Sequence, residues 1–466
     1  MKKLLLGSTA LAVGGLMAAP AMAADPIKIG VGGYYTFYAF AGSMEGNYAT
    51  NGTSVQYRGT QLIQEGEIHF IGQSKLDNGT TVGIRVELEG WNPPTNANAV
   101  SSANVPGGGL AVGSSNRQID EAYMFAFGDW GRVEVGAKDD AAYIMYYGAP
   151  SALIGFGFFQ HDSSFSWTNP VANANNKAAF RISTQTIDGQ YQDANRINYY
   201  TPRFAGLQIG VGYAPKINTT GSLGTSGLAN GPGNNTGGVC GFTDATTANG
   251  CPTNDYSYQD ALAIGANYLN KFGDFSVAAY GAYSYMSFVP GFQPGGVNQN
   301  TGANLGAWKQ MVFGAQVSYA GFTLGGSYGW DNNGLGNNYF TGLGNDTRSY
   351  ALALLYETGP WQLSVGGVVA FNDNGNGTLT VTNCTQASAC AVTQPGTQAA
   401  AFGQNPQAGA LQFGGETATK IEVGANYAMG PGIKVVGGFI YNNLQGPTNA
   451  VSGQSWAAIL GMDLRF

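Results

Sequence analysis

The sequence contains little charge, little histidine and little cysteine. Charged residues make up 10% of the 466 positions, whereas soluble domains carry about 25%. The 20 Lys and Arg are outnumbered by 27 Asp and Glu, and this acidic balance argues against a nucleic-acid-binding protein, which would be basic. The 2 His and 4 Cys offer few ligands for a metal ion.

Long apolar runs are also missing beyond the N-terminus, so the sequence predicts no transmembrane helix after residue 23. Glycine and aromatic residues are abundant instead, with 73 Gly and 12% Phe, Trp and Tyr. Gly costs about 1 kcal/mol at each helix-interior site, which disfavours long helices, and the aromatic content disfavours intrinsic disorder. The composition therefore indicates an all-β protein.

The N-terminus has the pattern of a secretory signal peptide. Lys2 and Lys3 precede an apolar stretch at residues 4–17, and small residues at positions 21–23 form a cleavage signal. We expect residues 1–23 to be removed as a signal peptide and residues 24–466 to form the mature domain.

Apolar and polar residues alternate in several segments of that domain. In the segment 81–89, Val82, Ile84 and Val86 share one face, while Arg85 and Glu87 share the other. Segments 131–138, 420–427 and 456–466 repeat the pattern. In a soluble sandwich the charged face would contact bulk water, whereas in a membrane barrel the apolar face contacts lipid and the charged face lines a lumen.

The lengths of the connections favour the barrel. Seven short connections, each containing a Gly, alternate with eight long ones rich in Asn, Gly, Thr, Ser and Pro. This pattern predicts a transmembrane antiparallel β-barrel of 16 strands with short periplasmic turns and long extracellular loops. The expected strands lie near residues 27–42, 60–75, 80–90, 115–128, 132–140, 193–203, 207–216, 258–270, 274–288, 307–319, 322–331, 347–357, 360–372, 416–427, 432–443 and 455–466.

Several blocks of this chain resemble the Gram-negative general porins, a group of sixteen-stranded trimeric proteins of alpha- and betaproteobacteria. The blocks are IKIGVGGY at 27–34, LDNGTTVGIRVELEG at 76–90, IDEAYMFAFGDWGRVEVGAKDDAAYIMYYGAP at 119–150, RINYYTPRFAGLQIGVGYAP at 196–215, and the terminal Phe466. The chain departs from enterobacterial porins because it lacks their Pro-Glu-Phe-Gly-Gly signature.

The resemblance implies residence in the outer membrane of a Gram-negative bacterium and a homotrimer surrounded by outer-membrane lipid. It further implies that the third extracellular loop, at about residues 141–192, folds into the pore. Phe466 is then the signal that the outer-membrane assembly machinery reads.

Strand alternation predicts which charged side chains face the lumen. The inward set is Lys28, Glu65, Glu67, Arg85, Glu87, Glu89, Asp120, Arg132, Glu134, Lys138, Arg196, Glu422 and Lys434. With the third loop, this set gives the candidate pore-lining residues Arg85, Glu87, Arg132, Glu134, Arg196, His161 and Asp162. They predict a water-filled porin for passive diffusion of ions and small hydrophilic solutes, with a mild preference for cations.

Two alternative functions remain open at this point. A channel specific for sugars or aromatic solutes would use the third-loop aromatic residues Phe156, Phe158, Phe159, Phe165 and Trp167 as stacking surfaces. The same residues could instead anchor the loop to the barrel wall. A non-transporting surface barrel or adhesin would explain the long loops but not the inward charges.

The cysteines and histidines suggest neither catalysis nor metal binding. Cys240 and Cys251 share one long loop, Cys384 and Cys390 share another, and local pairing into two disulfides is the natural choice for an exported protein. His161 lies near Asp162 and Ser163, but adjacency in sequence is not triad geometry. We expect no enzymatic activity, no metal site and no cofactor.

Overall fold

The computed structural model describes residues 26–47, 54–90, 119–157, 194–216, 257–289, 307–332, 346–372, 377–382, 390–393, 400–402, 409–413, 416–445 and 452–466. The expected signal peptide and most of the long loops therefore lie outside the described residues. The described part holds the complete barrel wall and the first twenty residues of the third long connection.

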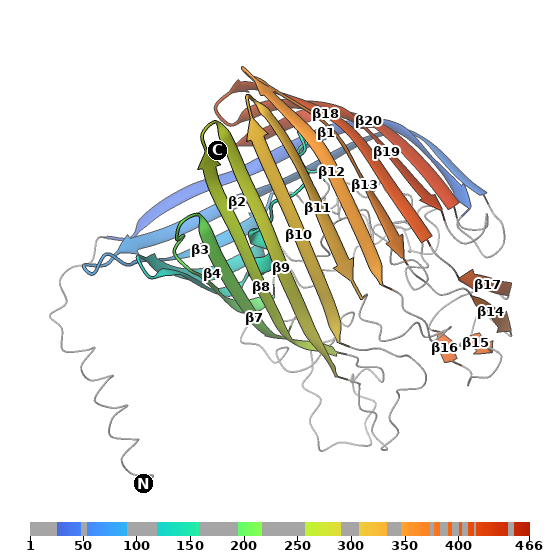
Figure 1. Ribbon diagram of the computed structural model, residues 1–466, viewed down its shortest axis with the longest axis horizontal. Helices are drawn as coiled ribbons and strands as arrows, with labels where there is room; N and C mark the ends of the chain where they lie inside the picture. Colours follow the sequence, from blue (N-terminus) through green and yellow to red (C-terminus); the bar gives the residue numbers. More distant parts are fainter. Residues whose placement is uncertain are drawn as a thin grey trace, which may run out of the picture.

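Sixteen antiparallel strands form a closed barrel, and they follow one another in chain order (Figure 1). Strand β1 pairs with β2 on one side and with the last strand on the other, which closes the sheet. All sixteen predicted strands are confirmed. They are β1 (Lys28–Asn47), β2 (Ser54–Lys75), β3 (Thr81–Glu89), β4 (Ile119–Gly128), β5 (Gly131–Ala137), β6 (Asn195–Tyr200), β7 (Leu207–Lys216), β8 (Ser257–Phe272), β9 (Phe275–Val289), β10 (Trp308–Tyr319), β11 (Phe322–Asp331), β12 (Thr347–Thr358), β13 (Trp361–Asn372), β18 (Glu416–Gly430), β19 (Ile433–Gln445) and β20 (Ser452–Arg465).

Glycine at positive φ forms each of the seven short turns, as the sequence predicts. The turn residues have φ between 54° and 115°. Glycine adopts this region without strain because it has no Cβ atom. They are Gly79, Gly131, Gly206, Gly273, Gly321, Gly359 and Gly432. Because these turns are tight, they fix the register of each hairpin and with it the face on which every side chain lies.

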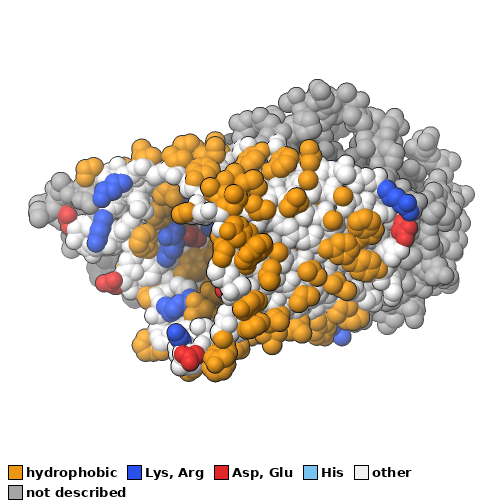
Figure 2. Space-filling view, turned by 90° about the horizontal axis from the view of Figure 1, so that it is seen from above, with side chains coloured by type: hydrophobic (Ala, Val, Ile, Leu, Met, Phe, Trp, Pro, Cys, Tyr) orange, Lys and Arg blue, Asp and Glu red, His pale blue; other side chains and the backbone are white. Residues whose placement is uncertain are grey.

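The outer wall of the barrel is apolar. Ile84 on β3, Val135 on β5 and Leu352 on β12 are all exposed on this wall. Figure 2 shows hydrophobic side chains gathered over the middle of one face, with most Lys, Arg, Asp and Glu toward its two ends. Aromatic residues in or beside the short turns are also exposed: Trp130, Phe204, Phe272, Phe322 and Trp361. An apolar band flanked by aromatic residues is the surface that a bilayer requires of a barrel.

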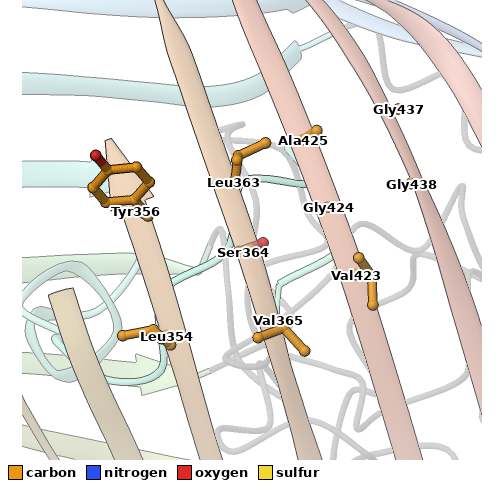
Figure 3. A pocket seen from close by; sticks show the side chains of 10 residues that line it. All are labelled: Leu354, Tyr356, Leu363, Ser364, Val365, Val423, Gly424, Ala425, Gly437 and Gly438. Atoms are coloured by element: carbon orange, nitrogen blue, oxygen red, sulfur yellow. The ribbon is translucent and has the colours of Figure 1, made fainter. Parts of the chain in front are cut away.

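One shallow groove of about 390 Å³ lies on this wall across β12, β13, β18 and β19 (Figure 3). Its floor is low where β19 carries Gly437 and Gly438, while exposed Leu363, Val365 and Val423 form its sides. Because these apolar side chains point away from the lumen, the groove is part of the lipid-facing surface.

The connection from β13 to β18 contains more structure than we predicted. The sequence predicted one of the eight long loops at residues 372–415, and four short strands form a separate antiparallel sheet there, in the order β16, β15, β14 and β17. They are β14 (Gly377–Thr382), β15 (Cys390–Thr393), β16 (Ala400–Phe402) and β17 (Gly409–Phe413). Short alternating segments such as that of β14 were hidden by the Asn-, Thr- and Gly-rich composition around them.

A short helix, α2 (Ala141–Ile144), follows β5 inside the barrel. The strand predicted at 132–140 ends earlier, at Ala137, because Asp140 caps this helix by accepting a hydrogen bond from the backbone N–H of Tyr143 at 2.8 Å. In the described part of the chain, no helix is both long enough and apolar enough to cross a membrane.

Candidate functional site

The inner wall of β1 to β6 carries most of the charged side chains, which strand alternation places there. The register pairs Glu67 with Glu89, His69 with Glu87, and Ile71 with Arg85 across β2 and β3. The neighbouring pairs of the same ladder carry the outward apolar residues, so one face is charged and the other contacts lipid.

Side chains of β1, β2 and β3 form a hydrogen-bonded cluster on this wall. Tyr34 donates its hydroxyl to Glu65 Oε1 at 2.9 Å and to Glu67 Oε1 at 3.0 Å. His69 Nε2 lies 2.7 Å from Glu67 Oε2, and Arg85 Nη2 lies 2.9 Å from His69 Nδ1. The chain of contacts therefore alternates carboxylate, imidazole and guanidinium along the barrel wall.

Arg85 and Glu87, two of the predicted pore-lining residues, form an ion pair on β3. Glu87 is 6% exposed and also faces His69 Nε2 at 3.8 Å. The sequence did not single out His69 for this site, although it shares its face of β2 with Glu67, and strand parity alone could have placed it there.

A further carboxylate, Glu121, lies on the same wall beside a β-bulge. Between the pairs Val86 with Ala122 and Leu88 with Ile119, the single residue Glu87 is opposite two residues of β4. We predicted Asp120 as the inward residue, whereas Glu121 is the buried carboxylate that binds Lys138, with Nζ to Oε distances of 2.6 and 2.7 Å. Glu121 has the same parity as Tyr123 and Phe125, which are also buried, so it continues the alternation of β4.

Arg132 and Glu134, the next predicted pair, lie together on β5. Arg132 Nε donates to Glu134 Oε1 at 2.7 Å. The guanidinium group also lies over the rings of Phe125 and Phe127, 4.8 and 5.6 Å from their centroids. These contacts hold the guanidinium group of Arg132 against the aromatic rings of β4.

Arg196 is in a different environment from the other predicted residues. It is 4% exposed, its Nη1 lies 3.8 Å from Asp140 Oδ2, and its Nε donates to the carbonyl oxygen of Ala194 at 3.3 Å. Arg196 thus stabilises the start of the third connection through its ion pair with Asp140. His161 and Asp162, the remaining predicted pore-lining residues, lie outside the described residues.

Residues 138–157, which we call the inner segment, run along the inner wall. The segment begins at β4 and β6, where Asp139 donates its backbone N–H to Glu121 Oε1 at 3.0 Å and accepts from Asn198 Nδ2 at 2.8 Å. Its helix α2 then packs against β8 and β9, with Ala142 beside Ala263 and Tyr280.

Small inward residues on β10 and β11 leave room for the middle of the inner segment. A Cβ atom at Gly314 would overlap the carbonyl oxygen of Tyr147. Gln316 Nε2 donates to the carbonyl oxygen of Gly148 at 2.7 Å, and Tyr146 donates its hydroxyl to Ser327 Oγ at 2.9 Å. Glycine therefore appears on these strands where the backbone of the segment approaches the wall most closely.

The end of the inner segment reaches β13, β18, β20 and β1. Ala152 donates its backbone N–H to Ser364 Oγ and accepts from Asn426 Nδ2, both at 2.8 Å. Phe156 is fully buried, and its ring lies 5.4 Å from that of Tyr38 and 5.6 Å from that of Phe40. For Phe156, the predicted anchoring of the loop to the wall is confirmed.

A buried ion pair on β18 supports this end of the segment. Lys420 and Glu422 are 2% and 1% exposed, with Nζ and Oε2 3.5 Å apart. Lys420 also donates to the carbonyl oxygens of Phe156 and, at 3.2 Å, Gly157, while Ser151 donates to Glu422 Oε1. The sequence predicted Glu422 to face inward but did not predict that it would bind the loop.

The remaining predicted features concern the cysteines and the C-terminus. Cys240, Cys251 and Cys384 lie outside the described residues, and Cys390 is described only as part of β15, so the two expected disulfides stay predictions. The backbone N–H and carbonyl of Phe466 bond with Gly33 at 3.1 and 3.0 Å, which joins the C-terminus to β1 where the barrel closes.

Proteins of two Rickettsia species are similar to this chain. An uncharacterized protein of Rickettsia conorii is 23% identical over 342 residues, covering 67% of this chain and 78% of that protein. An uncharacterized protein of Rickettsia typhi is 22% identical over 344 residues, with the same coverage.

Two solved structures share the fold at low sequence identity. The anion-selective porin from Comamonas acidovorans is 14% identical with a TM-score of 0.50, covering 94% of this chain and all of that one. The outer membrane channel DcaP of Acinetobacter baumannii is 11% identical with a TM-score of 0.51, covering 95% of this chain and 98% of that one.

The sequence profile of the Gram-negative porin family matches residues 7–287 and 271–462, which together span most of the chain. The match agrees with the closed barrel of sixteen strands, its apolar outer wall and its charged inner wall. The chain therefore belongs to the Gram-negative porin family and is an outer-membrane channel for small solutes.

Proposed function

We propose that the barrel is a water-filled porin through which ions and small hydrophilic solutes diffuse passively. The observation that carries this proposal is the charged inner wall of β1 to β6, opposite in character to the apolar outer wall. Charges of both signs are costly to bury in a dry interior, whereas a barrel of sixteen strands is wide enough to keep them hydrated.

The third extracellular loop, in this proposal, narrows the channel. The path of the inner segment along the wall supports it, because the segment reduces the open cross-section before the loop continues at residue 158. We propose that Arg85, Glu87, Arg132 and Glu134 line the narrow zone and that His161 and Asp162 face them from the loop. Arg196 would then act by holding the start of the loop in place.

The proposed ion selectivity is a mild preference for cations. Support comes from the inner wall of β2 to β4, where Glu65, Glu67, Glu87, Glu89 and Glu121 outnumber the nearby cationic side chains of β3 and of the inner segment. Because charges beyond about 8 Å are screened at physiological salt, these wall residues matter more than the net charge of the chain. Reversal potentials under a salt gradient test this preference, and anion preference would show that the arginines dominate.

Swelling of liposomes that contain the purified protein tests the transport mechanism. Sugars of graded size should enter at rates that fall smoothly with size if diffusion is passive. A single favoured sugar would indicate a substrate-specific channel instead, and an absence of swelling would indicate a surface barrel such as an adhesin.

The proposal includes how the channel is made and assembled. We propose that residues 1–23 are removed on export, which mass determination of the mature N-terminus would test.

The barrel then associates as a homotrimer after Phe466 has been read by the assembly machinery, and cross-linking in membranes would test the trimer. Local disulfides between Cys240 and Cys251 and between Cys384 and Cys390 would restrain two of the long loops, and non-reducing peptide mapping would detect them.

A further inference from the structure

We propose that Glu67, His69 and Glu87 form a binding site for a divalent transition-metal cation on the inner wall of the barrel. One potential ligand atom from each residue lies within 4.8 Å of those of the other two. The distances from His69 Nε2 are 2.7 Å to Glu67 Oε2 and 3.8 Å to Glu87 Oε2. Two adjacent strands therefore bring one imidazole nitrogen and two carboxylate oxygens to a single point.

A hydrogen bond orients Glu67 toward that point, and the second carboxylate, Glu87, forms an ion pair with Arg85. Tyr34 donates its hydroxyl to Oε1 of Glu67 at 3.0 Å, and Arg85 Nε forms an ion pair with Oε1 of Glu87. In each carboxylate Oε1 thus contacts a neighbouring side chain, while the other oxygen, Oε2, faces His69 Nε2. Hydrogen bonds of this kind fix the ligands of metal sites and are a regular part of their construction.

The donor set suits a first-row transition metal such as Zn²⁺. Imidazole nitrogen and carboxylate oxygen bind Zn²⁺ at about 2.0–2.2 Å, so ligand atoms around the ion lie roughly 3.4 Å apart. The observed separations of 2.7 and 3.8 Å lie on either side of that value. Three protein ligands leave at least one coordination position for water from the lumen.

The surrounding charge favours a cation. Five carboxylates line this part of the wall, at Glu65, Glu67, Glu87, Glu89 and Glu121. Arg85 and Lys138 contribute positive charge to this group through ion pairs with Glu87 and Glu121. The five carboxylates exceed these two positive charges, so a bound divalent cation would bring the local charge closer to zero.

Arg85 disfavours binding of a cation at this site, so its removal and the removal of a ligand should change the affinity in opposite directions. Its Nη2 lies 2.9 Å from His69 Nδ1, so Nδ1 accepts a hydrogen bond and the imidazole proton resides on Nε2, directed at Glu67. When a cation binds Nε2, that proton moves to Nδ1 and Arg85 must turn away from it. Removal of Arg85 should therefore strengthen metal binding, whereas removal of a ligand should weaken it.

Calorimetric titration of the purified, detergent-solubilised protein with ZnCl₂ tests the site. We expect His69→Ala, Glu67→Gln and Glu87→Gln to weaken binding by at least 10-fold, and Arg85→Met to tighten it by at least threefold. Glu65→Gln is the matched control, because it removes a carboxylate from the same wall without removing a ligand. Its affinity should stay within threefold of that of the unchanged protein.

Single-channel recording separates this inference from the proposed porin function. The inference needs only that water reaches the inner wall, so conductance without zinc tests the channel and zinc titration tests the site. Failure of zinc to bind at millimolar concentration would overturn the proposal. Equal affinity in the unchanged protein and the His69→Ala variant would overturn it as well, as would weaker binding after Arg85→Met.

Discussion

Replacement of Lys420 by Met should release the end of the inner segment from the barrel wall. Lys420 is 2% exposed, lies 3.5 Å from Glu422, and donates to the carbonyl oxygens of Phe156 and Gly157. Met has a similar length but no charge, so Glu422, which is 1% exposed, would lose its cationic partner while remaining buried. Breaking a buried ion pair in this way costs about 3–5 kcal/mol.

The inner segment is the part of the structure that can relieve this cost. Strand β18 is held along its length by hydrogen bonds to β13 and β19. Residues 151–157 are held mainly by side-chain contacts such as that of Ala152 with Ser364, and by burial of Phe156. Undocking these seven residues would let water reach Glu422 without breaking the barrel.

Amide hydrogen exchange measures this undocking directly. Ala152, Leu153 and Phe156 donate their backbone N–H groups to hydrogen bonds in the docked segment. If local opening becomes easier by about 3–5 kcal/mol, the protection of these amides falls by about 150- to 5,000-fold. Single-channel conductance should become higher and noisier because the segment no longer follows the wall.

Two further variants define the control for this experiment. Lys434→Met removes the same charge from an inward residue of β19 that contacts Gln362, and the amides of 151–157 should stay protected. The double change Lys420→Met with Glu422→Leu removes both charges and should recover part of the protection. Unchanged protection in Lys420→Met would refute the reasoning, as would a double variant that is worse than either single change.

Three other changes have defined outcomes. Deletion of Phe466 removes the last bonds between the C-terminus and the first strand, so folded protein in the outer-membrane fraction should decrease while export continues; normal yield would contradict this. Gly432→Val should lower the yield of folded barrel much more than Gly359→Val, because a Cβ at Gly432 meets the Arg465 carbonyl oxygen whereas one at Gly359 meets nothing; equal yields by heat-modified gel mobility would be inconsistent with that difference. Arg132→Ala should change conductance and shift the reversal potential toward cations, since its partner carboxylate loses its counter-charge; an identical current–voltage relation would place Arg132 outside the narrow zone.

Strand alternation and turn chemistry made most of the barrel predictable. Residues 207–216 and 322–331 were predicted with the same limits that β7 and β11 have in the structure. Each short turn contains a glycine at positive φ, so the hairpins follow from local conformational preferences. The faces of Arg85, Glu87, Arg132 and Glu134 followed from the same alternation, because side-chain direction in a strand depends only on parity.

Other features required contacts between residues far apart in the sequence. The bulge opposite Glu87 exists only in the pairing of β3 with β4. The small strands β14 to β17 are stabilised by hydrogen bonds to one another. No single segment of the sequence therefore reveals a strand by itself. His69 had the right parity, but its role depends on Arg85 and Glu87, which lie on a neighbouring strand.

The sequence by itself determined the strands, the turns and the side of the wall on which each strand residue lies, because these depend on neighbours close in the chain. Only the tertiary structure decided the path of the inner segment and the partners of the buried charges. Lys420 and Phe156 are 264 positions apart, yet one donates a hydrogen bond to the other. Such contacts form when the barrel closes and brings distant strands around a common interior, and no local pattern of residues encodes that geometry.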